Sequence, residues 1–394
     1  MDVSRSNIES LTELLESNSW NGKLVISPDV DGLVTANLIS HLFDAELIGF
    51  YDLGRKESRI LLAEGNEWKD AESALWLDHD ILDSRIISVG QHMIHPFSNS
   101  VDGLEGFNDR EGNFDFDRSS PFQRNLRSIN PHDFGRFGWD NHATFPRCPE
   151  EGCEGFAFPR GGYCKKHGGT WTKTSWSGNG RGFRRKYPFA TIHLFLAALN
   201  EYDIHFSQNA RMMVAHSDSA WLATTQNAKN AEWWLDNVLD SEPNSAMIAG
   251  EKPLHVGDRE TMLKHLEFIW LLDDEGVIDL VTDPREQRES KIRELSIYSA
   301  GFSKGNKQRL NGKWTEQGKL NELASITANI TGWNFKASHG PLHIVGVGET
   351  RKIFDPKSDP WGDDFGKWLR ENSVFSLAFT GMDVARFTTE MKIL

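Results

Sequence analysis

The stretch from Leu24 to Ile39, LVISPDVDGLVTANLI, decides the fold that we expect. A short apolar run, Lys23–Ile26, is broken by a Ser-Pro pair, and the later segment Val34–Phe43 has the apolar spacing of a helix. A strand that passes through a polar turn into a helix is the repeating unit of parallel α/β sheets. The turn carries Asp29 and Asp31, so we expect both carboxylates at the carboxyl end of a strand, where such sheets bind ligands.

The same alternation continues along the chain. Strand-like apolar runs are found at Leu47–Tyr51, Ala74–Leu77, Ile86–Val89, Leu342–Val347 and within Val374–Met391. Helical spacing is found at Asn7–Ser17, Phe189–Leu199, Asn227–Leu239, Arg259–Leu272, Arg288–Tyr298 and Leu320–Thr331, and Ala210–Ala215 is a further buried segment. The pattern predicts the α/β class, with a parallel sheet in the first part of the chain.

The length of 394 residues favours two or three domains. We expect a parallel-sheet α/β domain over residues 1–240, with an inserted element at about 140–187. A helical connector over 241–298 and a smaller C-terminal α+β domain for substrate binding over 299–394 would follow.

Composition favours a soluble globular protein in the cytoplasm. The net charge is −14, with 38% hydrophobic and 25% charged residues. No stretch approaches the roughly 18 consecutive apolar residues of a spanning helix, and the first residues are polar and acidic, unlike a signal peptide. We therefore expect no membrane partner.

The three cysteines lie within 17 residues of one another. Together with one histidine they offer the ligand types of a closed tetrahedral zinc site: Cys148, Cys153, Cys164 and His167. His142 competes as the fourth ligand, and the alternative to a site is three unrelated buried thiols. We expect structural Zn²⁺ here, because clustered cysteines in a cytosolic chain favour metal over disulfides.

A basic segment surrounds the cysteines. Residues 147–187 hold nine basic and three acidic side chains, a local charge of +6 against −20 for the remainder. Cations interleaved with aromatic rings suit a groove that follows phosphates and stacks bases, although a solvated glycine-rich loop has a similar composition. The candidate nucleic-acid-binding residues are Lys165, Lys166, Trp171, Lys173, Trp176, Arg181, Arg184, Arg185 and Lys186.

Carboxylates follow two further apolar runs. Asp78 ends the run Ala74–Leu77, and Asp218 follows Ala210–Ala215. With the pair after the first strand they form an oxygen-rich set of the kind that binds Mg²⁺ or Mn²⁺, and two such ions would clamp a phosphoryl centre and activate water. Taken singly, an aspartate after a strand is more often a helix N-cap or a turn residue.

In their order, these motifs resemble the DHH phosphoesterase superfamily over roughly residues 20–240. They are LVISPDVDGLVTANLI (24–39), ALWLDHDI (74–81), IISVGQHMI (86–94), INPHDF (129–134), YPF (187–189) and MMVAHSDSAW (212–221), each expected at a strand end. The resemblance, closest to the RecJ-like branch, implies a Mn²⁺- or Mg²⁺-dependent phosphodiesterase or exonuclease on single-stranded DNA, RNA or short oligonucleotides. It implies that Asp31, Asp78, His92 and Asp218 bind one ion, and that Asp29 and the bridging Asp78 bind the other. The same five residues would be the catalytic set.

The chain departs from the family at two places. Gln91-His92-Met93 stands where the family has Asp-His-His, which removes an orienting carboxylate and one imidazole. The upstream ligand of the second ion is replaced by Val25 or Ser27. These departures motivate an alternative, a lapsed relative that binds nucleic acid or a protein partner in replication, repair or defence.

Two other interpretations of the motifs remain open. Asp78-His79-Asp80 is a second candidate for the altered triplet. Residues 29–33, DVDGL, also resemble the nucleophile motif of haloacid-dehalogenase-like phosphatases, with the acidic pair at 363–364 as a late motif. The Ser-Pro pair interrupts the strand that such a nucleophile needs, so we rank this third.

Overall fold

The computed structural model describes residues 11–54, 56–83, 85–92, 128–129, 150, 167, 187, 189–199, 201–218, 319–354, 374–381 and 384–394. Its strands are β1 (Lys23–Ile26), β2 (Glu46–Leu53), β3 (Glu57–Ala63), β4 (Leu75–Leu77), β5 (Ile87–Val89), β6 (Ser128–Ile129), β7 (Lys336–Ala337), β8 (Leu342–Phe354), β9 (Val374–Gly381) and β10 (Val384–Ile393). Its helices are α1 (Leu11–Glu16), α2 (Val30–Phe43), α3 (Trp68–Glu72), α6 (Thr191–Ala198), α7 (Gln208–His216) and α13 (Leu320–Thr331).

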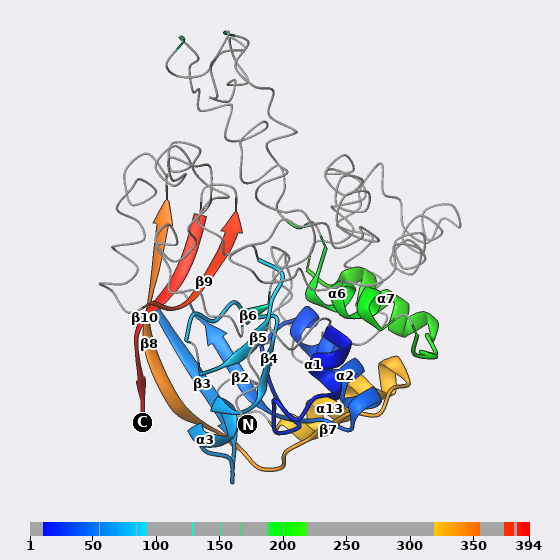
Figure 1. Cartoon of the computed structure of the whole chain (residues 1–394). Helices are drawn as coiled ribbons and strands as arrows, with labels where there is room; N and C mark the ends of the chain where they lie inside the picture. Colours follow the sequence, from blue (N-terminus) through cyan, green and yellow to red (C-terminus); the bar gives the residue numbers. More distant parts are fainter. Residues whose placement is uncertain are drawn as a thin grey trace, which may run out of the picture.

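The described strands form one curled, mixed sheet (Figure 1). Its order is β6-β5-β4-β1-β2-β3-β8-β10-β9, and β7 pairs with β2 outside this path. The strands from β6 to β2 are parallel, and those from β2 onward to β9 pair antiparallel. The α/β class and the parallel first part of the sheet are therefore confirmed.

The order of the parallel strands creates a topological switch point. From β1 the chain runs through α2 to β2 on one side, whereas β4 leads to β5 on the other side. Because β1 and β4 are hydrogen-bonded neighbours, the two connections leave adjacent strand ends in opposite directions. Open α/β sheets bind their ligands in the crevice that this divergence leaves.

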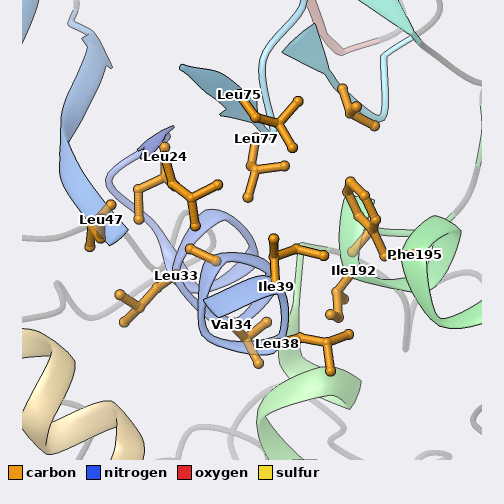
Figure 2. Close-up of a cluster of buried hydrophobic side chains, with 14 of the residues drawn as sticks. Leu24, Leu33, Val34, Leu38, Ile39, Leu47, Leu75, Leu77, Ile192 and Phe195 are labelled. Carbon is orange, nitrogen blue, oxygen red and sulfur yellow. The ribbon is translucent and has the colours of Figure 1, made fainter. Parts of the chain in front are cut away.

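Helix α2 is the centre of the main core. Every residue from Val30 to Ser40 is buried, because the sheet covers one side of the helix and α6, α7 and α13 cover the others. Figure 2 shows side chains of α2 meeting Leu24 of β1, Leu77 of β4 and Phe195 of α6. Such a buried position suits a helix that is mostly apolar, and its few buried polar residues include Asp31, Thr35 and Asn37. Because α2 is packed on all sides, the turn that precedes it is held in place.

The sheet curls until its far edge returns to the segment that follows β4. Ile81 forms an isolated antiparallel bridge with Ser376 of β9, and the Leu82 amide donates to the Phe375 carbonyl at 2.7 Å. A second core fills the enclosed face, where the rings of Tyr51, Trp76 and Phe375 pack edge to face. The C-terminal strands therefore touch the carboxyl end of β4.

The expected elements are found with some changes. Helix α2 begins four residues before the predicted segment, and β3 was not predicted. The expectation that the fourth motif follows a strand is wrong, because Ala210–Ala215 lies inside helix α7. Such a short apolar run does not distinguish the two structures by its periodicity. The segments Asn227–Leu239, Arg259–Leu272 and Arg288–Tyr298 lie outside the described residues.

The last strands continue the N-terminal sheet, because β8 pairs directly with β3. The division into domains at 1–240, 241–298 and 299–394 stays a prediction. Among the described helices, none has the length and apolar character needed to cross a bilayer.

Candidate active site

Three segments meet at the switch point: the turn between β1 and α2, the residue after β4, and the first turn of α6. Asp29 is the N-cap of α2, and its carboxylate accepts a hydrogen bond from the Gly32 amide at 3.1 Å. A Cβ on Gly32 would lie 2.5 Å from the carbonyl oxygen of Ser27, so only glycine fits there. The N-cap interpretation of Asp29 is thus correct, and the same cap brings its carboxylate to the site.

Asp31 lies in the first turn of α2 with only 2% of its surface exposed. Its two carboxylate oxygens accept hydrogen bonds from the backbone amides of Thr191 and Ile192, at 2.8 and 3.1 Å. These amides are the free N–H groups at the start of α6, where the helix dipole favours an anion. Asp31 therefore joins α2 to α6.

Asp78 directly follows β4 in a left-handed conformation, with φ of 58°. Aspartate adopts this region more readily than most residues, and its amide donates to the Val89 carbonyl of the neighbouring strand at 2.8 Å. Its carboxylate lies 2.5 Å from the Ser27 hydroxyl and 3.0 Å from the Thr191 hydroxyl. The turn thus directs the Asp78 side chain toward the β1 and α6 segments.

The Ser27 hydroxyl lies between two carboxylates. Its oxygen is 2.6 Å from Asp29 and 2.5 Å from Asp78. A serine hydroxyl has one proton and can donate to only one of them. Both contacts are satisfied only if one of the two carboxyl groups carries a proton, so the two acids compete for one hydroxyl proton.

The pKa shifts have the same cause. Burial raises the pKa of Asp31 to about 7, as do the charges of Asp29 and Asp218, while the two α6 amides lower it. Burial also raises the pKa of Asp78 well above its usual range, and the charges of Asp31 and Asp29 add to this. Four carboxylates predicted from the sequence therefore act on one another through their charges.

Asp218 is the fourth member of this acidic group. It comes two residues after the end of α7, half-buried and in a left-handed conformation with φ of 47°. Its charge raises the pKa of both Asp31 and Asp78. We call Asp29, Asp31, Asp78 and Asp218 the acidic cluster.

His92, the fifth predicted residue, pairs with a different carboxylate. Its Nδ1 lies 2.9 Å from Asp80 Oδ2, and the side chains are 17% and 1% exposed. His79, which lies between Asp78 and Asp80, points away from both, since its ring packs against Tyr51 and Trp76. The three side chains of Asp78-His79-Asp80 thus lie in three different environments, and of the three only Asp78 belongs to the acidic cluster.

The side chains in the described ranges do not form a ready ligand set. Among these residues, no group of three or more His, Cys, Asp or Glu side chains could hold a metal ion as arranged. The buried carboxylates are instead bonded to Ser27, Thr191 and the backbone of α6.

The remaining predicted residues lie mostly outside the described part of the chain. This applies to the three zinc cysteines and to all nine candidate nucleic-acid-binding residues. His167 is described and half-buried. The zinc site and the basic surface therefore stay predictions.

Sequence reasoning assigned no site role to Thr191 and an uncertain one to Ser27 and Asp80. Thr191 is the first residue of α6, where both its amide and its hydroxyl reach the cluster. Its signal was the motif YPF just before a predicted helix, because a helix start offers unpaired amides. Asp80 was visible only as part of the alternative triplet.

Neither protein-family models nor curated proteins nor solved structures gave a match to this chain. The resemblance to the DHH superfamily therefore stays a prediction from the order of the motifs.

Proposed function

We propose that the protein is a Mn²⁺- or Mg²⁺-dependent phosphodiesterase or nuclease that hydrolyses single-stranded DNA, RNA or short oligonucleotides. The observation that carries this proposal is the acidic cluster at the switch point between β1 and β4. Buried like charges oppose folding. A cluster that places two buried and two half-buried carboxylates at a ligand-binding position of the fold is best explained by a cationic ligand.

The chemistry of the donors fits a hard divalent cation. The cluster offers only carboxylate oxygens, with serine and threonine hydroxyls beside them, and such sets select Mg²⁺ or Mn²⁺ over softer metals. Asp29, Asp31, Asp78 and Asp218 would hold the ion, with His92 as the nitrogen ligand that the resemblance implies. A bound ion would supply charge for the phosphoryl oxygens and activate the attacking water.

Protein side chains prepare this site in two ways. The α6 amides and the Ser27 and Thr191 hydroxyls fix the orientations of the two buried carboxylates. Asp29 and Asp218 are half-buried and keep part of their surface exposed. An ion would therefore meet these two acids first, and it would replace some of the hydrogen bonds of Asp31 and Asp78 on binding.

The substrate class rests on the predicted basic segment of residues 147–187. In sequence it lies between the strand that ends at Ile129 and the start of α6, whose first residue contacts Asp31 and Asp78. A positively charged segment joined so directly to the acidic cluster would guide a polyanionic strand toward it.

Hydrolysis of end-labelled single-stranded DNA, RNA and a dinucleotide, each with Mn²⁺, Mg²⁺ or EDTA, tests the proposal. Asp78→Asn should abolish cleavage. Asp44→Asn is the matched control, because Asp44 has the same left-handed backbone, with φ of 59°, but lies exposed at the end of α2. Metal-dependent cleavage that Asp78→Asn removes and Asp44→Asn keeps would support the nuclease.

The alternative, a lapsed relative that binds nucleic acid or a partner, predicts a different result. Gln91 stands at the signature position and is 4% exposed, which favours a structural role for that side chain. Tight oligonucleotide binding without cleavage under any metal condition would replace our proposal with this alternative.

A further inference from the structure

The Asp80–His92 pair joins two strand ends. Asp80 comes after β4 and His92 after the neighbouring β5, and Nδ1 of the histidine lies 2.9 Å from a carboxylate oxygen. The carboxylate is almost fully buried and the imidazole is partly exposed, at 1% and 17%. One partner is therefore fixed inside the protein while the other reaches its surface.

The backbone around Asp80 is held from two sides. Its carbonyl accepts from the Leu377 amide of β9 at 3.2 Å, and the next residue, Ile81, bridges Ser376 of the same strand. The Ile81 amide also donates to the Ser88 hydroxyl of β5, at 3.3 Å. The returning edge of the sheet thus fixes the segment that carries the carboxylate.

Gly90 has no side chain, and the Asp80 carboxylate occupies the space where one would lie. A Cβ at this position would collide with Asp80 Oδ1 and would come within 2.7 Å of the His79 carbonyl. The carboxylate therefore packs directly against the backbone two residues before His92, and its position is set by sterics as well as by the hydrogen bond.

The chemistry of the pair favours one histidine tautomer. An ionised Asp80 carboxylate only accepts hydrogen bonds, so beside it a neutral imidazole would carry its proton on Nδ1 and keep its lone pair on Nε2. Histidines that bind metal ions have this arrangement, with the second nitrogen bonded to a carboxylate. The residue that stands where the family has its carboxylate, Gln91, is buried, and within the described ranges its Oε1 has no hydrogen-bond partner.

We infer that Asp80 is the positioning residue for His92, holding the proton on Nδ1 so that Nε2 can bind a divalent cation. The cation-binding part of this inference rests on the proposed function, whereas the tautomer does not.

Two measurements on the metal-free 394-residue chain test the inference. The first is the Mn²⁺ affinity by calorimetry for the wild type, Asp80→Ala and Asp80→Asn. The second is the ¹⁵N signature of the His92 ring, assigned by its loss in His92→Gln, at a pH where imidazole is neutral. Asp83→Asn is the control, since Asp83 lies in the same segment but pairs with Arg85 at the surface.

Asp80→Ala should weaken Mn²⁺ binding about 10- to 100-fold and release the proton from Nδ1, whereas Asp83→Asn should change neither. Asp80→Asn keeps the size of the side chain and guards against misfolding. Its amide can donate to Nδ1 as well as accept from it, so this variant should also lose the single tautomer.

The outcomes separate the inference from the proposed function. Wild-type affinity and an unchanged tautomer in both Asp80 variants would overturn the inference while leaving the nuclease in place. If the wild type neither binds Mn²⁺ nor cleaves, the proposed function fails, and the ring signal alone decides the positioning role. A wild-type Nδ1–H that both variants lose would support that role, and a signal that they keep would overturn it.

Discussion

Asp78→Asn should make the metal-free protein more stable while removing its activity. The carboxylates of Asp29 and Asp78 both contact the Ser27 hydroxyl, so two of their oxygens lie within about 5 Å of each other. At an effective dielectric constant of about 20, two unit charges at that separation repel by about 3 kcal/mol. A proton on one group relieves part of this repulsion, so we expect a gain of about 1–3 kcal/mol from the neutral amide.

The amide should be well accommodated at this position. Both partners of the Asp78 carboxylate, Ser27 and Thr191, are hydroxyls that can donate or accept. Asparagine also tolerates the left-handed backbone, with φ of 58°. The substitution therefore removes charge without leaving a buried polar atom unpaired.

Urea unfolding at pH 8 in EDTA measures the effect, with Asp44→Asn as the control for the left-handed backbone. Asp44 is exposed and lies outside the acidic cluster, so its substitution should change stability by less than about 0.5 kcal/mol. Mn²⁺ should stabilise the wild type by mass action and the Asp78 variant much less, reversing their order. If Asp78→Asn is less stable than the wild type in EDTA, the argument that repulsion between the carboxylates destabilises the metal-free protein is refuted.

Three further predictions concern single features of the site. Burial raises the folded-state pKa of Asp31 to about 7, so between about pH 4 and 7 the folded state binds a proton that the unfolded state has lost. The free energy of unfolding in EDTA should therefore fall as pH rises through that window, by up to about 1.4 kcal/mol per pH unit. Asp31→Asn should flatten this profile, and an unchanged slope would contradict the assignment to Asp31. Gly32→Ala, normally favourable in a helix, should lower the free energy of unfolding by about 1–3 kcal/mol because its Cβ meets the Ser27 carbonyl; equal urea midpoints would count against the packing. Deleting residues 148–186 should remove one bound zinc by elemental analysis and weaken oligonucleotide binding, and unchanged affinity in a folded variant would remove the predicted guiding role.

Much of the first half of the fold could be predicted, because its signals are local. The run Lys23–Ile26 ends at a Ser-Pro pair and continues into an apolar helix, and the structure has β1 and α2 there. Parallel pairing also predicts that Asp29 and Asp78 lie at the same edge of the sheet. That β1 and β4 are neighbours within it is a contact between distant residues, which the structure supplies.

The remainder depends on contacts between residues far apart in the chain. Nothing local indicates that Thr191 would donate to carboxylates more than a hundred positions earlier. The edge strand β9 likewise reaches the segment after β4 only because the sheet curls. From the sequence, Asp80 is only one member of the triplet Asp78-His79-Asp80. Its pairing with His92 is evident only in the folded structure.

The same long-range contacts explain how the fold accommodates a cluster of acids. Without the two α6 amides, Asp31 would keep only the 3.3 Å hydrogen bond from the Thr35 hydroxyl, and α6 is held there by its packing on α2. The hydrophobic core around α2 thus offsets the free-energy cost of burying the carboxylates. A core substitution between α2 and α6, such as Phe195→Leu, should therefore disturb the site by loosening the α6 amides from Asp31, although Phe195 belongs to the hydrophobic core.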